Sequence, residues 1–487
     1  MKRILLLLLA AAFSIPLLGI SLFYGYENWI GRAAWSKAEA ILKAAGEPMS
    51  MDALRPKPVP DAMNMAAAPI FQQIFTFYSP QRAEVYGLHL PPATGRAQPT
   101  AGLVALARRF HSDFTGDAAA AARVILDGLQ PMEPMLQAIR EAAERPASVW
   151  PLKYQRGEAV PTPFLPPLRQ TVEVLFARAE AAIAENDSAT AMAEFELITR
   201  LARDANQPPL LVTCLAEQAM LGCALNIVRD GLAQDVWSDE QLVRIGETLS
   251  RFRPLDSFAG SVRGERALFL ASPEMATAKT EPQFTLIDFR TPTSEWISTV
   301  MCRVAWDLRP SGWMALDRAS YSTFTQDWLS IVLRKGFVRP WALKDWNAKL
   351  RTLRHDPVEL FRTPVTAFAL ATFTPVARRA AYMQTSVDLT RLACAIELHR
   401  RATGSVPKNL AGLAPQQIAT VPRDAVGGSP YFYRATNGGS FMLYGRGWNA
   451  RDDGGSSANA NVLIGPSSAD DWVWQPGPHP QRQASVN

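Results

Sequence analysis

The stretch Leu168–Ala205, LRQTVEVLFARAEAAIAENDSATAMAEFELITRLARDA, is the part of the chain that most clearly decides the fold. Apolar residues recur in it at the spacing of one face of an amphipathic α-helix. The pattern breaks at the polar run Glu185–Ser188, whose residues are suited to ending one helix and capping the next. The stretch therefore predicts a helical hairpin, and a mainly α-helical scaffold around it.

The regular helical pattern continues on both sides and predicts a helical domain over residues 161–379. Inside it, PLLVTCLAEQAMLGCALNIV (Pro209–Val228) is apolar enough to suggest a membrane span, but Glu217 and Gln218 lie near its centre. Because charged groups are costly in a bilayer, the segment is better explained as a buried helix of the scaffold. Ser238, followed three residues later by Gln241, predicts a capping box at the start of a further helix.

Size and composition indicate a folded protein of two or three domains. The chain has 487 residues, of which 48% are hydrophobic and 20% are charged, so it can bury a large core. Its formal net charge of +5 is small for this length, whereas a nucleic-acid-binding protein would concentrate basic residues on one face or tail. We therefore expect no nucleic acid partner.

The N-terminus carries a candidate transmembrane anchor, assigned to residues 1–26. Lys2 and Arg3 precede ILLLLLAAAFSIPLLGISLFY (Ile4–Tyr24), an uncharged stretch that would extend about 31 Å as a helix and cross a bilayer core. Aromatic residues follow where the membrane interface would lie, at Tyr24, Tyr26 and Trp29. The basic end is expected to stay in the cytoplasm, with the rest of the chain beyond the membrane. The alternative is a cleaved signal peptide with Gly19–Ser21 as its cleavage site.

After residue 379 the pattern changes, and residues 380–476 are predicted to form a small α+β module. A helix is expected at Thr385–Gly404, with Gly404 as its stop. Asn437–Gly439 lies between aromatic-rich runs and predicts a β-hairpin, because Asn-Gly pairs favour tight turns. Residues 27–160 are predicted to be a stalk with mixed helices and loops, and residues 477–487 a flexible tail.

Two residue types in the helical region each allow two explanations. No close cysteine pair indicates a zinc or redox site, and buried reduced thiols are favoured over disulfides. The cysteines are Cys214, Cys223, Cys302 and Cys394. Six tryptophans lie between Trp296 and Trp346, and we expect them to fill a helical core. The alternative is a surface that lies on the membrane or holds an apolar partner.

The stretch FMLYGRGWNARDDGG (Phe441–Gly455) contains the candidate metal site. Glycines and acidic residues follow a strand with no helix after it, so a phosphate cradle is excluded. Arg451 falls where an EF-hand loop requires an oxygen ligand. The side chains that could bind Ca²⁺ in another arrangement are Asn449, Asp452, Asp453, Asp470 and Asp471. The alternative is a solvated turn in which these residues only reverse the chain.

No motif in the sequence points to an enzymatic activity. The nucleophile-elbow, zinc-protease, P-loop and dinucleotide-binding patterns are absent, and the five histidines lie far apart along the chain. One hypothesis is a non-enzymatic envelope protein. The other is a periplasmic hydrolase or ligand-binding protein with a site in the helical domain, which predicts a deep pocket where His, Asp or Glu side chains converge.

The C-terminal module resembles the soluble domain of the major pseudopilin of type II secretion. The resemblance covers Asp388–Trp474 and rests, in this order, on ACAIELHRRATGSVPKNLAGL, VPRDAVGGSPYFYR, FMLYGRGWNARDDGG and ADDWVW. It implies a helix packed on a small antiparallel sheet, with Ca²⁺ in the C-terminal loop. Asn449 stands where that family has an aspartate, whereas Asp470 and Asp471 match its second acidic cluster. The prepilin processing site is absent, so assembly into a pilus by that route is not expected.

Over its whole length the chain resembles a family of bacterial membrane-anchored proteins that carries no assigned activity. The matching stretches include YENWIGRAAWSKAEAILKAAGEP, KPVPDAMNMAAAPIF and RPSGW. We therefore expect a single-pass protein of the bacterial inner membrane, with most of the chain on the periplasmic side. Its helical scaffold would carry the pseudopilin-like module, which would contact protein partners in the cell envelope.

Overall fold

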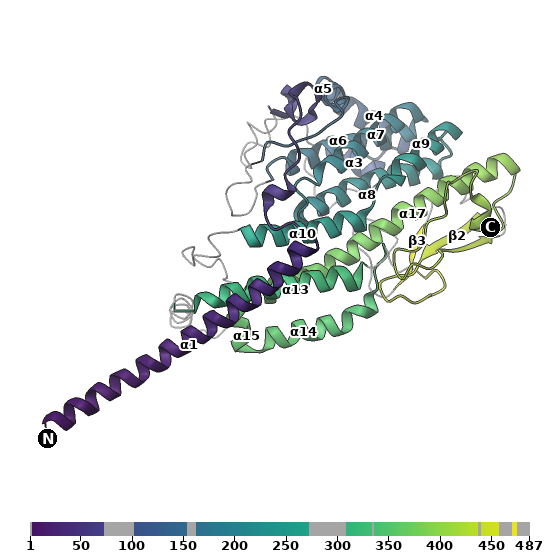
Figure 1. Ribbon diagram of the computed structural model, residues 1–487. Helices are drawn as coiled ribbons and strands as arrows, with labels where there is room; N and C mark the ends of the chain where they lie inside the picture. Colours follow the sequence, from purple (N-terminus) through teal and green to yellow (C-terminus); the bar gives the residue numbers. More distant parts are fainter. Residues whose placement is uncertain are drawn as a thin grey trace.

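The computed structural model describes residues 2–72, 102–152, 162–271, 308–333, 336–436, 440–456 and 470–474. It shows a mostly helical protein with a small antiparallel sheet near the C-terminus, which confirms the predicted fold class at this level (Figure 1). The helices are α1 (Lys2–Ala44), α3 (Leu103–Phe110), α4 (Ala118–Leu129), α5 (Glu133–Ala143), α6 (Leu165–Ala184), α7 (Ser188–Ala205), α8 (Leu211–Ala233), α9 (Asp239–Ser250), α10 (Pro254–Ala271), α13 (Ser311–Val332), α14 (Leu343–His355), α15 (Pro357–Arg362), α16 (Pro364–Ala369) and α17 (Phe373–Thr403). The strands are β1 (Phe432–Thr436), β2 (Ser440–Gly445) and β3 (Trp472–Trp474).

Helices α6 and α7 form the predicted hairpin. Asn186 takes a left-handed backbone conformation in the turn, with φ of 60°, and Asp187 caps α7 by accepting a hydrogen bond from the Thr190 N–H at 3.0 Å. The facing sides of the two helices bury apolar residues such as Leu175 and Phe195 in one core. The hairpin is thus a product of local pattern and local capping, as the sequence predicted.

Helix α8 lies inside the scaffold, packed against α6, α7, α10 and α17. Within the described part of the chain it is the helix whose length and composition would allow it to cross a membrane, but 67% of its most apolar window is buried in the protein. Glu217 and Gln218 are both buried there, and Glu217 accepts hydrogen bonds from Asn206 and Ser257. The prediction of a buried scaffold helix is confirmed.

The predicted capping box and the buried thiols are also present. The Ser238 hydroxyl accepts a hydrogen bond from the Gln241 N–H, and the Gln241 side chain accepts one from the Ser238 N–H, at the start of α9. The described cysteines are free and buried, at Cys214, Cys223 and Cys394. Cys302 lies outside the described residues.

Helix α17 is shared by the scaffold and the sheet. It packs against α8 and α9 with residues such as Met383 and Val387, against α10 with residues such as Phe373, and against the sheet with residues such as Leu392. Gly404, with φ of 75°, ends the helix as expected, because glycine adopts this left-handed conformation without a Cβ penalty. The helix begins at Phe373, earlier than the predicted start at Thr385. Residue 380, where the C-terminal module was predicted to begin, therefore lies inside a continuous helix.

The sheet has the order β1-β2-β3, with both pairings antiparallel. The register between β1 and β2 ends at the pair Thr436–Ser440, which confirms the hairpin predicted around Asn437–Gly439, although those three residues lie outside the described part. The Phe432 and Tyr444 rings stack across the strands with centroids 4.9 Å apart. The sheet is therefore held by cross-strand aromatic contacts as well as by backbone hydrogen bonds.

Some tryptophans of the region between Trp296 and Trp346 lie in the helical core. Trp328 and Trp346 are buried, and Trp328 packs edge-to-face against Phe258. Trp341, in contrast, is 56% exposed. The expectation of a helical core is therefore confirmed for two of the described tryptophans, while Trp296 and Trp306 lie outside the described residues.

Candidate functional site

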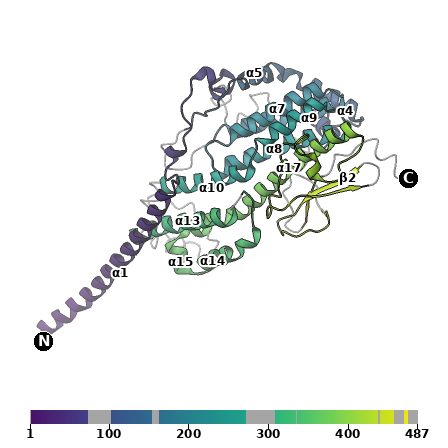
Figure 2. The same cartoon turned by 45° about the vertical axis from the view of Figure 1, so that its right-hand side comes forward.

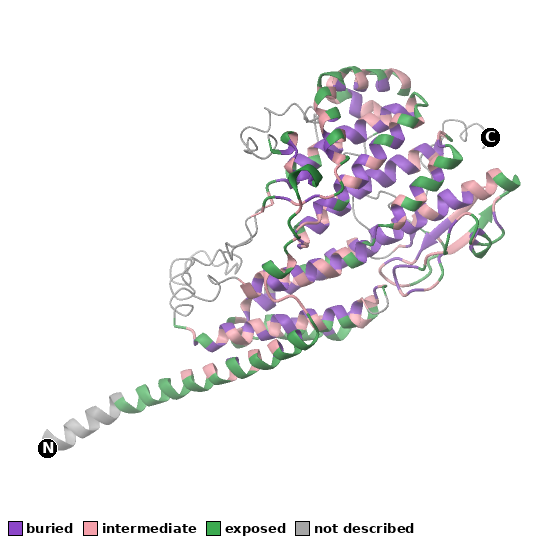
Figure 3. Ribbon diagram, turned by 45° about the horizontal axis from the view of Figure 1, so that its top comes forward, coloured by how far each residue is buried: buried purple, intermediate pink, exposed green. Residues whose placement is uncertain are grey.

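The first candidate site is the part of α1 that extends beyond the body of the protein (Figure 3). Helix α1 has 43 residues and would be about 65 Å long. Among its described side chains, five aliphatic ones are between 56% and 69% exposed, namely Ile15, Leu17, Leu18, Ile20 and Leu22. A helix that is apolar on all sides and has no protein around it is typical of a segment that lies in lipid.

The second half of α1 packs along α13 through a close backbone contact. A Cβ on Gly31 would overlap the carbonyl oxygen of Gly312, and a Cβ on Gly312 would overlap backbone atoms of Glu27 and Asn28. Both positions therefore require glycine, as at close helix crossings. The predicted boundary at residue 26 lies inside α1, and residues of the predicted stalk pack directly on the body.

Polar side chains of α1 complete the start of α13. No side chain at the N-cap position of α13 bonds to that helix, but Asn28 Oδ1 accepts hydrogen bonds from the Gly312 N–H at 2.6 Å and the Ser311 hydroxyl at 3.0 Å. Glu27 accepts hydrogen bonds from the Trp313 indole N–H at 2.8 Å and from Arg362 at 3.0 Å. Helix α1 thus supplies the cap of a helix that lies far from it in sequence.

The other end of the packed segment is held by a buried ion pair. Glu47, just after α1, pairs with Arg263 at 3.1 Å and with the guanidinium group of Arg266, which is fully buried. Burial lowers the pKa of Arg266, and the charge of Glu47 opposes that effect. Removing one partner of such a pair leaves an uncompensated buried charge, so α1 is coupled tightly to the body.

The second candidate site is the acidic loop at the C-terminus, where sequence predicted a metal. Asp471 is 1% exposed, and its Oδ2 accepts hydrogen bonds from the backbone N–H groups of Asp453 at 2.9 Å and Gly455 at 2.8 Å. The Asp471 N–H donates to the Ser456 carbonyl at 3.1 Å. These contacts join residues 453–456 to residue 471, and we call this arrangement the C-terminal clasp.

The other predicted ligands lie in or next to the clasp. Asp452 Oδ1 accepts hydrogen bonds from the Tyr444 hydroxyl and the Gly454 N–H, both at 3.0 Å. The Asn449 amide donates to Asp453 Oδ2 at 2.7 Å. The carbonyl of Asp470 lies so close to Gly447 that a side chain there would overlap it. The loop residues chosen from sequence are therefore close together, in an arrangement closed by hydrogen bonds.

The clasp offers an incomplete ligand set for a calcium ion. Asp471 Oδ1 is buried and has no hydrogen-bond partner, so one carboxylate oxygen is available. Burial raises the pKa of Asp471, two backbone N–H groups lower it, and the charges of Asp453 and Asp452 raise it further. Among the described residues, no group of three or more His, Cys, Asp and Glu side chains is arranged to hold a metal ion. Calcium binding therefore remains a prediction.

A buried acid–tyrosine network beside the clasp was missed by the sequence reasoning. Asp388 on α17 accepts hydrogen bonds from the Tyr431 hydroxyl at 3.1 Å and the Gln384 amide at 3.3 Å. Asp424 is fully buried and accepts hydrogen bonds from the N–H groups of Val426 at 2.9 Å and Arg446 at 2.8 Å. No clear pattern singled out Asp388, because Ser386, Thr390 and Arg391 lie in the same stretch of helix. No local pattern distinguishes Asp424.

Burial dominates the titration of this network. Burial raises the pKa of Asp388 to about 6, although Gln384 and Arg391 oppose the shift. Burial likewise raises the pKa of Asp424 to about 7, against the hydrogen bonds from the backbone of Val426 and Arg446. Asp388 joins α17 to the segment before β1, and Asp424 joins that segment to the residues after β2.

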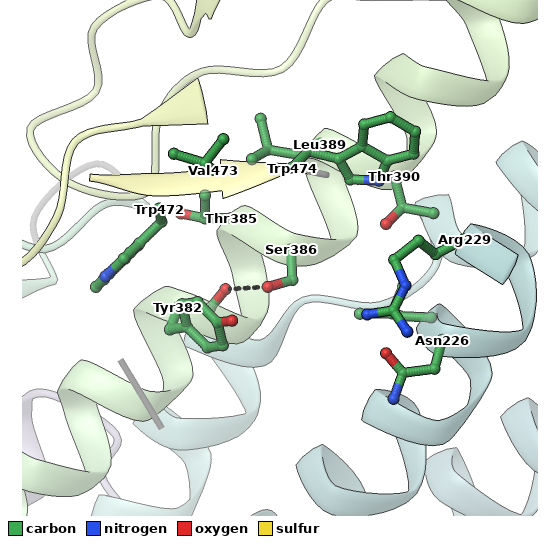
Figure 4. A pocket seen from close by; sticks show the side chains of 11 residues that line it. Asn226, Arg229, Tyr382, Thr385, Ser386, Leu389, Thr390, Trp472, Val473 and Trp474 are labelled. Carbon is green, nitrogen blue, oxygen red and sulfur yellow. Dashed lines mark hydrogen bonds between the residues drawn. The ribbon is translucent and has the colours of Figure 1, made fainter. Parts of the chain in front are cut away.

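Figure 4 shows a cavity of about 40 Å³ between α8, α17 and β3. Its lining residues are Leu225, Asn226, Arg229, Tyr382, Thr385, Ser386, Leu389, Thr390, Trp472, Val473 and Trp474. The Asn226 side chain is 1% exposed and has no hydrogen-bond partner on either amide atom. The volume suits a few water molecules, and the lining contains no histidine and no carboxylate. This cavity therefore gives no support to a hydrolase.

Comparison with protein-family models, with curated proteins and with solved structures gave no match to this chain.

Proposed function

We propose that this protein is a non-enzymatic, single-pass protein of the bacterial inner membrane that holds a helical scaffold on the periplasmic side. The observation that carries the proposal is the exposed apolar surface of α1 beyond the body. Moving a leucine or isoleucine side chain from water into an apolar medium is favourable by about 1.5–3 kcal/mol. Five such side chains in the described part of α1 alone therefore favour lipid over water by about 10 kcal/mol.

The orientation follows from charge. Lys2 and Arg3 precede the apolar stretch, and basic residues next to a membrane span are retained in the cytoplasm. The body would then lie outside the inner membrane. The tight packing of α1 on α13, with Glu27 and Glu47 both paired to arginines, supports a body fixed to its anchor rather than tethered by a loose linker.

The C-terminal module is the proposed contact surface for protein partners. The sheet lies at the end of the body opposite to the point where α1 emerges (Figures 1 and 2). The stacked rings of Phe441 and Trp474, with centroids 5.6 Å apart, are only partly covered. Aromatic side chains are enriched in protein interfaces, so this surface supports a role in protein contacts, as does the pseudopilin resemblance.

The topology is tested by adding protease to spheroplasts that express the full chain with a C-terminal tag. The tag should be digested without lysis, and the protein should stay in the membrane pellet after alkaline carbonate extraction. Changing Leu17 and Leu18 together to Asp should release the protein from the pellet, because buried charges oppose insertion.

Val243→Asp is the matched control. Val243 is 46% exposed on α9, so this change should not affect retention in the membrane pellet. A tag that stays protected would refute the orientation, and carbonate release of the unaltered chain would refute the anchor.

A further inference from the structure

Three exposed apolar side chains lie at the end of the body from which α1 emerges. Leu308 precedes α13, while Val358 and Phe361 lie on α15, and their exposed fractions are 62%, 61% and 36%. We call these three residues the rim. Figures 1 and 2 both show α15 at this end of the body, next to α1. Within the described residues, the rim is thus an apolar surface with no protein element covering it.

Direct contacts fix the level of the rim along α1. The Tyr24 hydroxyl donates a hydrogen bond to the carbonyl of Leu308. Three residues further along α1, Glu27 pairs with Arg362, the last residue of α15, at 3.0 Å. The Phe23 ring packs edge-to-face on Trp313 at 6.5 Å. The rim therefore lies beside residues 23–27 of α1.

The length of the apolar stretch places residues 23–27 at a membrane interface. From Ile4 to Tyr24 a helix rises about 30 Å, which equals the thickness of a bilayer core. Tyr26 and Trp29 are 60% and 68% exposed on α1 at this level, where aromatic side chains commonly meet the headgroups. Since Tyr24 contacts Leu308, the rim reaches the same interface.

The charges around the rim suit a bilayer surface. Helix α14 ends with Arg354 and His355 directly before α15, and both are exposed, as is Arg351 one turn earlier. The two acidic residues on this turn have local partners. Asp356 accepts hydrogen bonds from the N–H groups of Val358 and Glu359, and Glu359 pairs with Arg362 at 2.7 Å. Basic side chains beside an apolar patch are typical of surfaces that contact anionic headgroups.

We propose that the rim inserts into the headgroup region of the same bilayer that α1 crosses, so that the body contacts the membrane at a second point. This proposal rests on the proposed anchoring of α1. A helix alone leaves the body free to rotate about its axis, whereas a second contact fixes which face of the scaffold points away from the membrane. The α15 side of the body then faces the lipid, and the sheet is held away from it.

The test uses single-cysteine variants of the full chain, labelled with an environment-sensitive fluorophore and reconstituted into vesicles of phosphatidylethanolamine and phosphatidylglycerol. The background is one in which the native cysteines take no label. Labels are placed at Val358→Cys and Phe361→Cys in the rim, at Ile20→Cys in α1, and at Val243→Cys on α9. Quenching is then measured with lipids that carry a spin label in the headgroup region or along the acyl chain.

The proposal predicts that headgroup spin labels quench positions 358 and 361 several-fold more than position 243. Position 20 should be quenched by acyl-chain spin labels. If position 20 is quenched while 358 and 361 behave like 243, the rim lies in water or under a protein partner, and the proposal is overturned although the anchor stands. If position 20 is not quenched either, the proposed anchoring itself fails. All four labelled positions are exposed, so circular dichroism of each variant should match the unaltered chain.

Discussion

The hydroxyl of Tyr431 donates a hydrogen bond to Oδ2 of Asp388 across 3.1 Å, inside the contact between α17 and the chain segment that leads into β1. Both side chains are buried, and the same hydroxyl accepts a hydrogen bond from the Ala425 N–H at 3.3 Å. The Asp388 side chain on the scaffold helix is thus bonded to the C-terminal module. The protonation of Asp388 is therefore coupled to the stability of that contact.

Stability should decrease as pH rises through about 6, and Asp388 should be one of the buried acids responsible, together with Asp424. Burial raises the pKa of Asp388 from 3.8 to about 6 in the folded state, so the folded protein holds this proton more tightly than the unfolded chain does. The contribution of Asp388 to the free energy of unfolding is complete below about pH 4. It is lost as pH rises through about 6, and the total loss is about 3 kcal/mol. Asp388→Asn should flatten the dependence of melting temperature on pH in this window.

Tyr431→Phe should have the opposite effect to Asp388→Asn on the pH dependence of stability. The Tyr431 hydroxyl favours the charged form of Asp388, so removing it should raise the pKa of Asp388 and extend the pH dependence of stability to higher pH. Melting temperatures followed by circular dichroism at several pH values between about 4 and 7 separate the two cases. Equal slopes for Asp388→Asn and the unaltered chain would show that Asp388 does not titrate in this window.

The C-terminal clasp should depend on the Asp471 carboxylate. Its Oδ2 accepts hydrogen bonds from two backbone N–H groups. Hydrogen bonds to a charged group contribute about 1.5–3 kcal/mol each to stability. Asp471→Ala should therefore speed amide hydrogen exchange at Asp453 and Gly455 by at least tenfold. Asp127→Ala, which changes a carboxylate on α4, is the control and should leave these amides unchanged. Unaltered exchange in Asp471→Ala would mean that other contacts close the loop.

Local features of this fold could be predicted from sequence, whereas contacts between distant residues could not. The α6–α7 hairpin and the capping box at Ser238 depend on residues within a few positions of one another, so their patterns are visible in the chain. Asn28 caps α13 from 284 residues away, and no periodic pattern in the sequence predicts a contact at that distance. The start of α17 was missed because Pro375, which could end a helix, lies in its first turn, where proline is tolerated.

In the candidate site, too, local features could be predicted from sequence and contacts between distant residues could not. The acidic residues around Asp452 and Asp471 were identified because Asp and Gly gather near a strand end, and the structure brings them together in the clasp. Their partners are mostly backbone N–H groups, whose positions depend on how the chain turns. The rim was not predicted, because Leu308 and Val358 are ordinary apolar residues until the fold places them beside Tyr24.

Calcium should slow exchange in the acidic loop if the predicted site forms. Asp471 Oδ1 is the buried oxygen without a partner, and the carboxylates of Asp452 and Asp453 lie near enough to affect its pKa. Millimolar Ca²⁺ should then protect the amides of residues 450–456 in the full chain, and Asp471→Ala should abolish the protection. Magnesium is the control, because its octahedral geometry suits this loop less well. No protection by Ca²⁺ would leave a loop closed by hydrogen bonds alone.

The contact between Gly31 and Gly312 should be the most sensitive point in the attachment of α1 to the body. A Cβ on Gly31 would overlap the Gly312 carbonyl, so Gly31→Ala must push α1 away from α13 and disturb the Asn28 cap. Overpacking of this kind costs about 1–3 kcal/mol, and the melting temperature of the purified chain in detergent should fall. Gly25→Ala is the matched control, because a Cβ on Gly25 meets no atom within 4 Å and alanine favours the helix. Equal melting temperatures for the two variants would show that α1 and α13 do not pack closely, and the rim would lose the contact on which its proposed position at the membrane depends.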